Sequence, residues 1–241
     1  FNLANLLIVA AIDIAGMAVA FPVGIGIALV LGVVVNYLAI PVGDPKVLFA
    51  GVGLVAVAIV LDALAYKKLS QGQKATPTKG IALSVIGGVL MGFFFRFVAA
   101  STSTDFANPE AGLFTPYTSV FVFAIGIFLS NFLWNTIFMY KPFKGEAVTY
   151  ADYFKQGDFK LHLIGILGGA IWCIGMSLSM IASEKAGFAI SYGLGQGATM
   201  VAAAWGVFIW REFKSAPKGT NLLIGLMFLS FTIGLALIIM S

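Results

Sequence analysis

The sequence predicts an all-α polytopic membrane protein that contains an inverted repeat. Three observations lead to this prediction. Of the 241 residues, 60% are hydrophobic and only 10% are charged, whereas a soluble domain carries about 25% charged residues. Eight apolar segments are separated by short polar stretches. Residues 15–26 resemble residues 186–197, and this similarity indicates an internal duplication.

The eight apolar segments are predicted to be helices. A helix that spans the hydrocarbon core needs about 20 apolar residues, and only the first segment is too short. The segments cover approximately residues 1–12, 16–38, 47–66, 80–100, 116–140, 161–183, 187–210 and 221–240. A proline-rich turn follows the second segment, and residues 67–79 form a polar linker. Residues 141–160 mix charged and aromatic side chains, so we expect them to lie along the membrane surface.

A shift of 171 positions aligns the two copies of the repeat. The aligned positions include three glycine pairs and one acidic pair: Gly16 with Gly187, Gly24 with Gly195, Gly26 with Gly197, and Asp13 with Glu184. Segments one to three then match segments six to eight, and segments four and five have no counterparts upstream. We therefore expect two N-terminal helices and part of a third to be missing from a protein of five plus five helices. An odd number of helices per copy inverts the second copy in the membrane.

The repeat also divides the chain into units. Residues 1–66 are the last three helices of the first copy, 67–79 are the linker, and 80–241 are the complete second copy. Of the 14 lysines and arginines, 11 fall on one face of the membrane, including Lys74 in the linker. Basic loops lie on the cytoplasmic side, so the linker and residues 141–160 and 211–220 are predicted to be cytoplasmic.

Inverted repeats are typical of secondary transporters, whose substrate sites lie near the middle of the membrane. We expect a group of amide and aromatic side chains at or near that depth: Asn2, Asn5, Asn131, Trp134, Asn135, Trp172, Tyr192 and Gln196. Interhelical hydrogen bonding and packing are the alternatives for these residues. Arg96 either extends outward to the membrane surface or contacts substrate at the outer mouth. An uncharged site of this kind suits a neutral, polar, ring-shaped solute such as a sugar or a ureide.

The glycines and the charged residues have two interpretations each. One group of residues either permits close helix packing or acts as hinges: Pro22, Gly24, Gly26, Gly193, Gly195 and Gly197. Asp13 and Glu184 are expected to cap the helices that follow them, and Asp62 is expected at the membrane interface. The candidates for proton coupling are Asp62, Glu184 and His162.

Several classes of function are not favoured. The sequence contains no catalytic triad, no HExxH pattern and no cluster of Cys and His, so we expect no enzyme activity, no metal and no cofactor. The net charge of +4 is small and does not indicate a nucleic-acid partner. The expected partners are a small solute and membrane lipid, and the sequence does not indicate an oligomeric state.

The chain resembles the drug/metabolite transporter superfamily, and within it the glucose/ribose porter and ureide permease families. The resemblance is carried by residues 1–5, 15–26, 115–118, 185–197 and 205–213. It implies ten helices in two inverted five-helix repeats and solute uptake, often linked to protons. Plant ureide permeases have a long central cytosolic segment with a nucleotide-binding-like motif, which this chain lacks.

We therefore expect a sugar transporter of a bacterial inner membrane that works by alternating access. A ureide, nucleobase or drug permease is the first alternative. A membrane scaffold that does not transport, or a subunit that depends on a partner, is the second.

Overall fold

The computed structural model describes residues 1–69 and 78–241, apart from the side chains of Ala18, Tyr66 and Lys67. Within these residues the chain is helical and has no β-strand. The helices are α1 (Asn2–Ala15), α2 (Met17–Ala39), α3 (Pro45–Leu69), α4 (Thr78–Ala100), α5 (Pro116–Tyr140), α6 (Tyr150–Gln156), α7 (Phe159–Gly195), α8 (Ala198–Ala204), the π-helical turn η2 (Trp205–Ile209) and α9 (Thr220–Met240). The middle of the predicted linker, with Lys74, lies outside the described residues.

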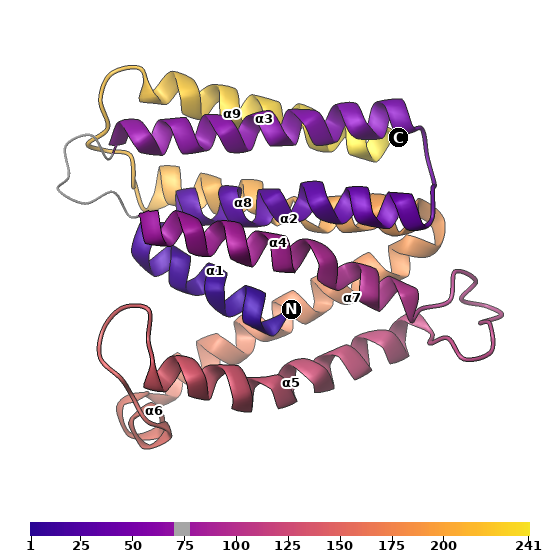
Figure 1. Ribbon diagram of the computed structural model, residues 1–241, viewed down its shortest axis with the longest axis horizontal. Coiled ribbons are helices and arrows are strands. Elements are labelled where there is room, and N and C mark those ends of the chain that lie inside the picture. Colours follow the sequence, from indigo (N-terminus) through magenta and orange to yellow (C-terminus); the bar gives the residue numbers. More distant parts are fainter. Residues whose placement is uncertain (70–77) are drawn as a thin grey trace.

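The helices identify an integral membrane protein. Among the described residues, six helical stretches are long and apolar enough to cross a membrane. The longest, Phe159–Ile209, is bent at Gly187 and runs along the bundle twice, once in each direction (Figure 1). The eight predicted segments correspond to α1–α5, the first arm of α7, its second arm with α8 and η2, and α9. The predicted all-α polytopic membrane protein is therefore confirmed.

The spanning helices lie side by side along the long axis of the molecule (Figure 1). α3 and α9 form one outer layer, α2 lies between α8 and α4, and α5 lies on the opposite side. We call the end where α3 ends and α4 begins the basic end, and the opposite end the far end. The basic residues near helix termini at the basic end are Lys68, Lys79, Lys141, Lys144, Lys155, Lys160, Arg211, Lys214 and Lys218.

Helices that correspond in the predicted repeat run in opposite directions. α1 opposes the first arm of α7, α2 opposes the second arm with α8, and α3 opposes α9 (Figure 1). The aligned glycines Gly16 and Gly187 adopt the same backbone conformation, with φ/ψ of 87°/157° and 76°/159°. This conformation is open to glycine and strongly unfavourable for other residues. Both glycines sit between two helical arms and let the chain turn there without a loop.

Close helix contacts through glycine form much of the core. A Cβ on Gly51 of α3 would lie 2.6 Å from the carbonyl oxygen of Gly234 of α9, and the reverse distance is 2.8 Å. α2 and α4 meet in the same way at Gly24 and Gly88. Such contacts let two backbones approach and gain dispersion energy. In contrast, Gly165 of α7 has no described neighbour within 4 Å of its notional Cβ and makes no such contact.

We predict that Gly234→Ala destabilises the protein and that Gly225→Ala does not. The added methyl group at Gly234 would meet the backbone of α3, and overpacking of this kind costs about 1–3 kcal/mol. Gly225 lies on the same helix with nothing within 4 Å, and alanine is the better helix former. Thermal unfolding in detergent measures both effects. Equal midpoints for the two variants would show that α3 and α9 do not meet at Gly234.

Candidate functional site

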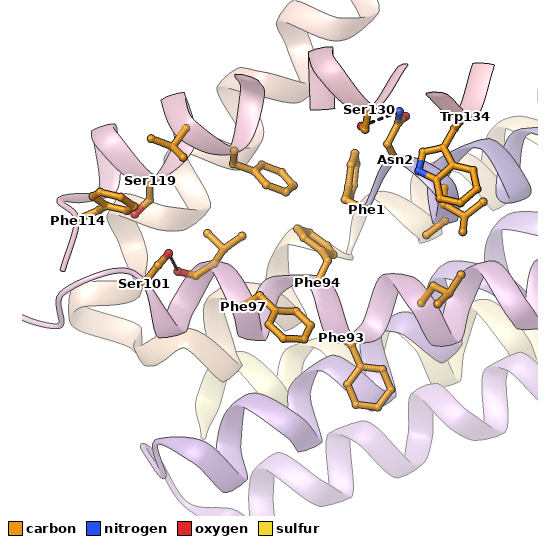
Figure 2. A pocket seen from close by; sticks show the side chains of 16 residues that line it. Phe1, Asn2, Phe93, Phe94, Phe97, Ser101, Phe114, Ser119, Ser130 and Trp134 are labelled. Atoms are coloured by element: carbon orange, nitrogen blue, oxygen red, sulfur yellow. Dashed lines mark hydrogen bonds between the residues drawn. The ribbon is translucent and has the colours of Figure 1, made fainter. Parts of the chain in front are cut away.

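A cavity of about 600 Å³ lies between α1, α4 and α5 (Figure 2). Among the described residues, no charged side chain lines it. Its aromatic lining residues are Phe1, Phe93, Phe94, Phe97, Phe114, Phe123 and Trp134, and its polar ones are Asn2, Ser101, Ser119 and Ser130. An apolar cavity with a few convergent polar groups is the usual form of a small-molecule site.

A cluster of amide and hydroxyl groups joins α1 to α5 beside this cavity. The Asn2 side chain donates a hydrogen bond to Ser130 Oγ at 3.1 Å (Figure 2). It also donates one to Asn131 Oδ1 at 3.0 Å. Both acceptors lie just past the centre of α5. Amides in an apolar layer are costly unless they find partners, and here they satisfy one another. The two predicted asparagines meet, and the sequence analysis missed Ser130.

An aromatic cluster forms the adjoining wall. The Phe1 ring lies 4.9 Å from both Phe94 and Trp172, and 5.4 Å from Phe123, between ring centroids. Phe94 and Phe123 are stacked, with 5.5 Å between centroids and 16° between planes. Trp172 of α7 contacts this cluster without lining the cavity. Trp134, also predicted, lines the cavity itself (Figure 2).

Polar contacts hold α5 at the far end. The Thr102 hydroxyl lies 2.6 Å from Ser119 Oγ and donates to the carbonyl of Val98. In the same loop Phe106 donates its backbone N–H to Glu184 Oε1 at 3.2 Å. The hydroxyl of Ser103 donates to Glu110 and, as the largest cause, holds the pKa of that carboxyl below its ordinary value. The loop is therefore ordered and attached to α7.

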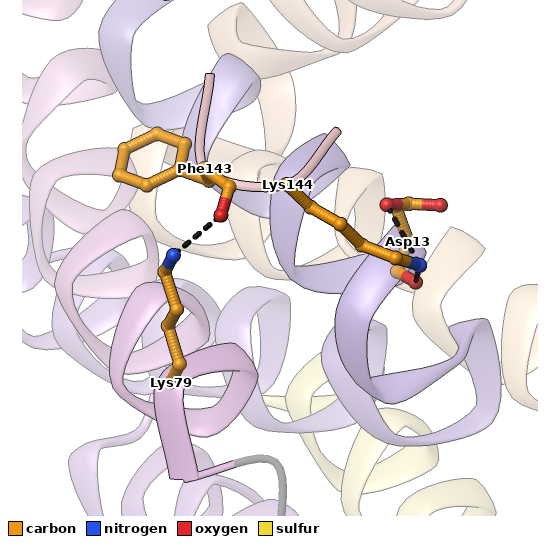
Figure 3. A network of polar contacts seen from close by, with 4 residues as sticks. All are labelled: Asp13, Lys79, Phe143 and Lys144. Atoms are coloured by element: carbon orange, nitrogen blue, oxygen red, sulfur yellow. Dashed lines mark hydrogen bonds and ion pairs between the residues drawn. The ribbon is translucent and has the colours of Figure 1, made fainter. Parts of the chain in front are cut away.

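Two lysines hold α5 at the basic end (Figure 3). Lys79, at the start of α4, donates to the Phe143 carbonyl oxygen. Lys144 donates to the Asp13 carbonyl oxygen at 3.0 Å and pairs with its carboxylate at 3.2 Å. The segment after α5 is thus fixed to both α1 and α4.

The expectation that Asp13 and Glu184 cap helices is wrong. Their carboxylates hold the segments at the two ends of α5 instead. The first N–H of α2, that of Met17, donates to Glu212 Oε1 at 3.0 Å. An acid distant in the sequence therefore caps this helix, because the residue before it, Gly16, has no side chain.

Four other predicted ligands do not line the cavity. Asn5 is exposed on α1, and Arg96 is half-buried on α4. Asn135 lines a second cavity between α5, α6 and α7, where its Oδ1 is buried without a hydrogen-bond partner. Gln196 follows the last residue of α7 and is half-buried. Their roles as ligands stay predictions.

Tyr192 forms an interhelical hydrogen bond instead of lining the cavity. Its side chain is 2% exposed, and its hydroxyl lies within hydrogen-bond distance of the carbonyls of Ala28 and Met91, at 3.1 and 3.2 Å. Its ring occupies the space beside Gly32, where a Cβ would be 1.9 Å away. Tyr192 thereby joins α7 to α2 and α4, which is the alternative that the sequence left open.

The predicted hinge residues are in tight contacts, apart from one break in the second copy. α2 continues through Pro22 without interruption, while Gly24 packs against Ile8 and Ser84, and Gly26 against Ile59. Gly193 packs against Val33 and Ile238. The helix is interrupted only after Gly195, where Gln196 and Gly197 form a turn before α8.

The three candidates for proton coupling lie in different surroundings. Asp62 is completely buried, and among the described residues neither carboxylate oxygen has a hydrogen-bond partner; its position at the membrane interface stays a prediction. Glu184 is exposed at the far end. His162 packs on Tyr153 at the basic end, with 4.8 Å between ring centroids.

Comparison with known proteins indicates the family of the chain. The sequence model of the family described as "Ureide permease" matches residues 71–241. Ureide permease 4 of Arabidopsis thaliana is 24% identical over 164 residues, which are 67% of this chain and 40% of that protein. Transmembrane protein 144 homolog B of Dictyostelium discoideum is 30% identical over 154 residues, or 62% of this chain and 38% of that protein. The match therefore spans about two fifths of these relatives. No solved structure matches significantly.

We predict that Tyr192→Phe lowers the stability of the protein by about 1 kcal/mol, the usual net contribution of one neutral hydrogen bond. Tyr37→Phe is the control, because no hydrogen bond of its hydroxyl is found among the described residues. Thermal unfolding tests the difference. If both variants unfold like the parent protein, the Tyr192 hydroxyl does not stabilise the bundle. The alternative, that Tyr192 contacts the ligand, would then be favoured.

Proposed function

The chain belongs to the ureide permease family, and from this we propose that it moves a small, neutral, polar solute of the ureide class across the membrane. The observation that carries the proposal is the uncharged cavity with the amide pair Asn2 and Asn131 beside stacked aromatic rings. Ureide permease is also the name of several similar proteins. No charged side chain lines the cavity to attract an ionised solute.

The chemistry of a ureide fits this cavity. A ureide carries alternating N–H and C=O groups, and an asparagine side chain has one acceptor and two donors. The donors of Asn2 are used by Ser130 and Asn131, which leaves Asn2 Oδ1 to accept an N–H of the solute. The flat ring of a cyclic ureide stacks on an aromatic face, as Phe94 and Phe123 stack on each other. The volume of about 600 Å³ lies within the usual range of small-molecule pockets, about 300–1,000 Å³.

The sugar and the bacterial membrane expected from the sequence have less support. Amides and aromatic rings also bind sugars, but no relative found here carries a sugar in its name, whereas several are named ureide permeases. Arabidopsis and Dictyostelium are eukaryotes, so these relatives give no support to a bacterial inner membrane. We propose that the basic end faces the cytoplasm, because basic residues are retained on that side.

We further propose that transport occurs by alternating access of two inverted repeats, with 1–66 in the first, 80–241 in the second and 67–79 between them. The opposite directions of corresponding helices (Figure 1) and the shared conformation of Gly16 and Gly187 support this arrangement. Membership of the wider drug/metabolite transporter superfamily stays a prediction.

We predict saturable uptake of labelled allantoin, a cyclic ureide, by proteoliposomes that contain the chain. Excess unlabelled allantoin should abolish the uptake, and excess D-glucose should leave it unchanged, because the proposed solute class is the ureide. Empty liposomes are the control. Uptake of glucose without allantoin would replace the ureide by a sugar, and movement of neither solute would favour the membrane scaffold.

We predict that Asn2→Ala raises the KM for allantoin about 3- to 10-fold, because one hydrogen-bonding group of about 0.5–1.5 kcal/mol is lost from the cavity wall. Asn5→Ala is the matched control on the same helix, one turn away and exposed. Initial uptake rates over a range of allantoin concentrations provide both values of KM. Equal KM values for the two variants would remove the Asn2 cluster from the proposed site.

A further inference from the structure

Asp62 is a carboxyl group enclosed within the membrane-spanning part of α3. It lies three residues before the end of the apolar span Pro45–Ala65, or about 4.5 Å along the helix axis. Its side chain is 0% exposed, and neither oxygen has a hydrogen-bond partner. Among the described helices, α2 and α9 pack most extensively on α3, and neither contains an acidic or a basic residue. The segment between η2 and α9, which lies at the same end of α3, carries Arg211, Glu212, Lys214 and Lys218.

The charge state of Asp62 follows from these surroundings. A carboxylate without hydrogen bonds or a cation in an apolar interior is very costly, and such a group takes up a proton instead. Ionisable residues inside a membrane are rare and are by default functional. A neutral, protonated Asp62 is the form that fits this enclosure.

Glu212 connects Asp62 with the turn at Gly16. Glu212 lies close enough to Asp62 for the charges of the two acids to interact. The same Glu212 accepts the Met17 N–H at 3.0 Å. A Cβ on Gly16 would lie 3.0 Å from its Oε2. The nearest basic side chain on α3 with a described position, Lys68, has its Nζ beside Gly219 at the start of α9.

We propose that Asp62 is the proton-binding site that links a proton to the opening of the basic end. With its proton, Asp62 packs between α2 and α9, and Glu212 holds the first turn of α2. When the proton leaves to water, the carboxylate repels Glu212 and draws water in, which loosens the contact with Met17 at the Gly16 turn. The step is the reversible binding of one proton by one carboxylate and needs no other reactant.

The other two candidates lack the enclosure that this role requires. Glu184 is exposed at the far end and accepts the Phe106 N–H. His162 lies at the basic end against Tyr153 of the short helix α6. Neither group has to change its hydration when the protein opens. Only Asp62 gains solvent on opening, so only Asp62 connects proton binding with conformation.

The test of coupling rests on the proposed ureide transport and compares Asp62→Asn with Asp44→Asn. Asparagine resembles the protonated acid in size and polarity, so the closed arrangement is preserved. Asp44 carries the same type of side chain, exposed at the other end of the same helix, where it accepts the Lys46 N–H. With an inward proton gradient, the parent protein and Asp44→Asn should accumulate allantoin. Asp62→Asn should accumulate at least tenfold less, yet should still exchange labelled for unlabelled allantoin.

Accumulation by Asp62→Asn at the level of the parent protein would overturn the proposal. So would uptake by the parent protein that does not respond to the proton gradient, while the proposed transport itself would stand. A second measurement needs no solute: infrared difference spectra between acid and alkaline buffer should show the C=O band of a protonated carboxyl group. The band should be lost in Asp62→Asn and kept in Asp44→Asn. Its presence in Asp62→Asn would overturn the proton site even if no solute is transported.

Discussion

Two glycines with positive φ that join helix to helix directly, Gly16 and Gly187, are the constraint from which the rest of the structure follows. Each allows a helix to turn into the next one without a loop, and each is in contact with the other half of the molecule. A Cβ on Gly16 would meet Glu212, after η2, and a Cβ on Gly187 would meet Val42, after α2. The turn at Gly16 sets the direction of α1. It therefore also sets the place at which Asn2, at the opposite end of α1, contacts α5.

The molecule combines a tightly packed block, formed by α2, α3, α4 and α9, with a more loosely attached helix, α5, which forms one wall of the cavity. Glycine contacts join α3 to α9 and α2 to α4, so that backbone packs against backbone. Contacts with loops hold α5 near its two ends, and the amide pair holds it near its middle. The pair of Lys144 and Asp13 is about 60% exposed, and exposed pairs contribute only about 0–1 kcal/mol. The wall of the cavity is therefore easier to move than the block behind it.

Hydropathy and glycine patterns in the sequence are sufficient to predict the helices and both turns, because these depend on local composition. Counting residues from the helix ends gives the depth of each residue in the membrane, and this is sufficient to predict that Asn2, Asn131, Trp134 and Trp172 lie close together. The side of a helix on which a residue lies cannot be predicted in this way. A helix that is apolar all round has no polar side to orient it, so the burial of Asp62 and Tyr192 could not be predicted. Phe94 and Phe123 carried no signal among 22 phenylalanines.

Under the proposed repeat, differences between the two copies distinguish the two ends of the molecule. The first copy has Phe21 where the second has Tyr192, so only the second copy carries a hydroxyl that reaches the carbonyls of Ala28 and Met91. Aligning Gly51 with Gly225, a shift of 174, pairs Asp62 with Ala236. Under the proposed symmetry, an enclosed acid exists at the basic end and has no counterpart at the far end. In the proposed mechanism, a proton bound at Asp62 therefore favours closure of the basic end only.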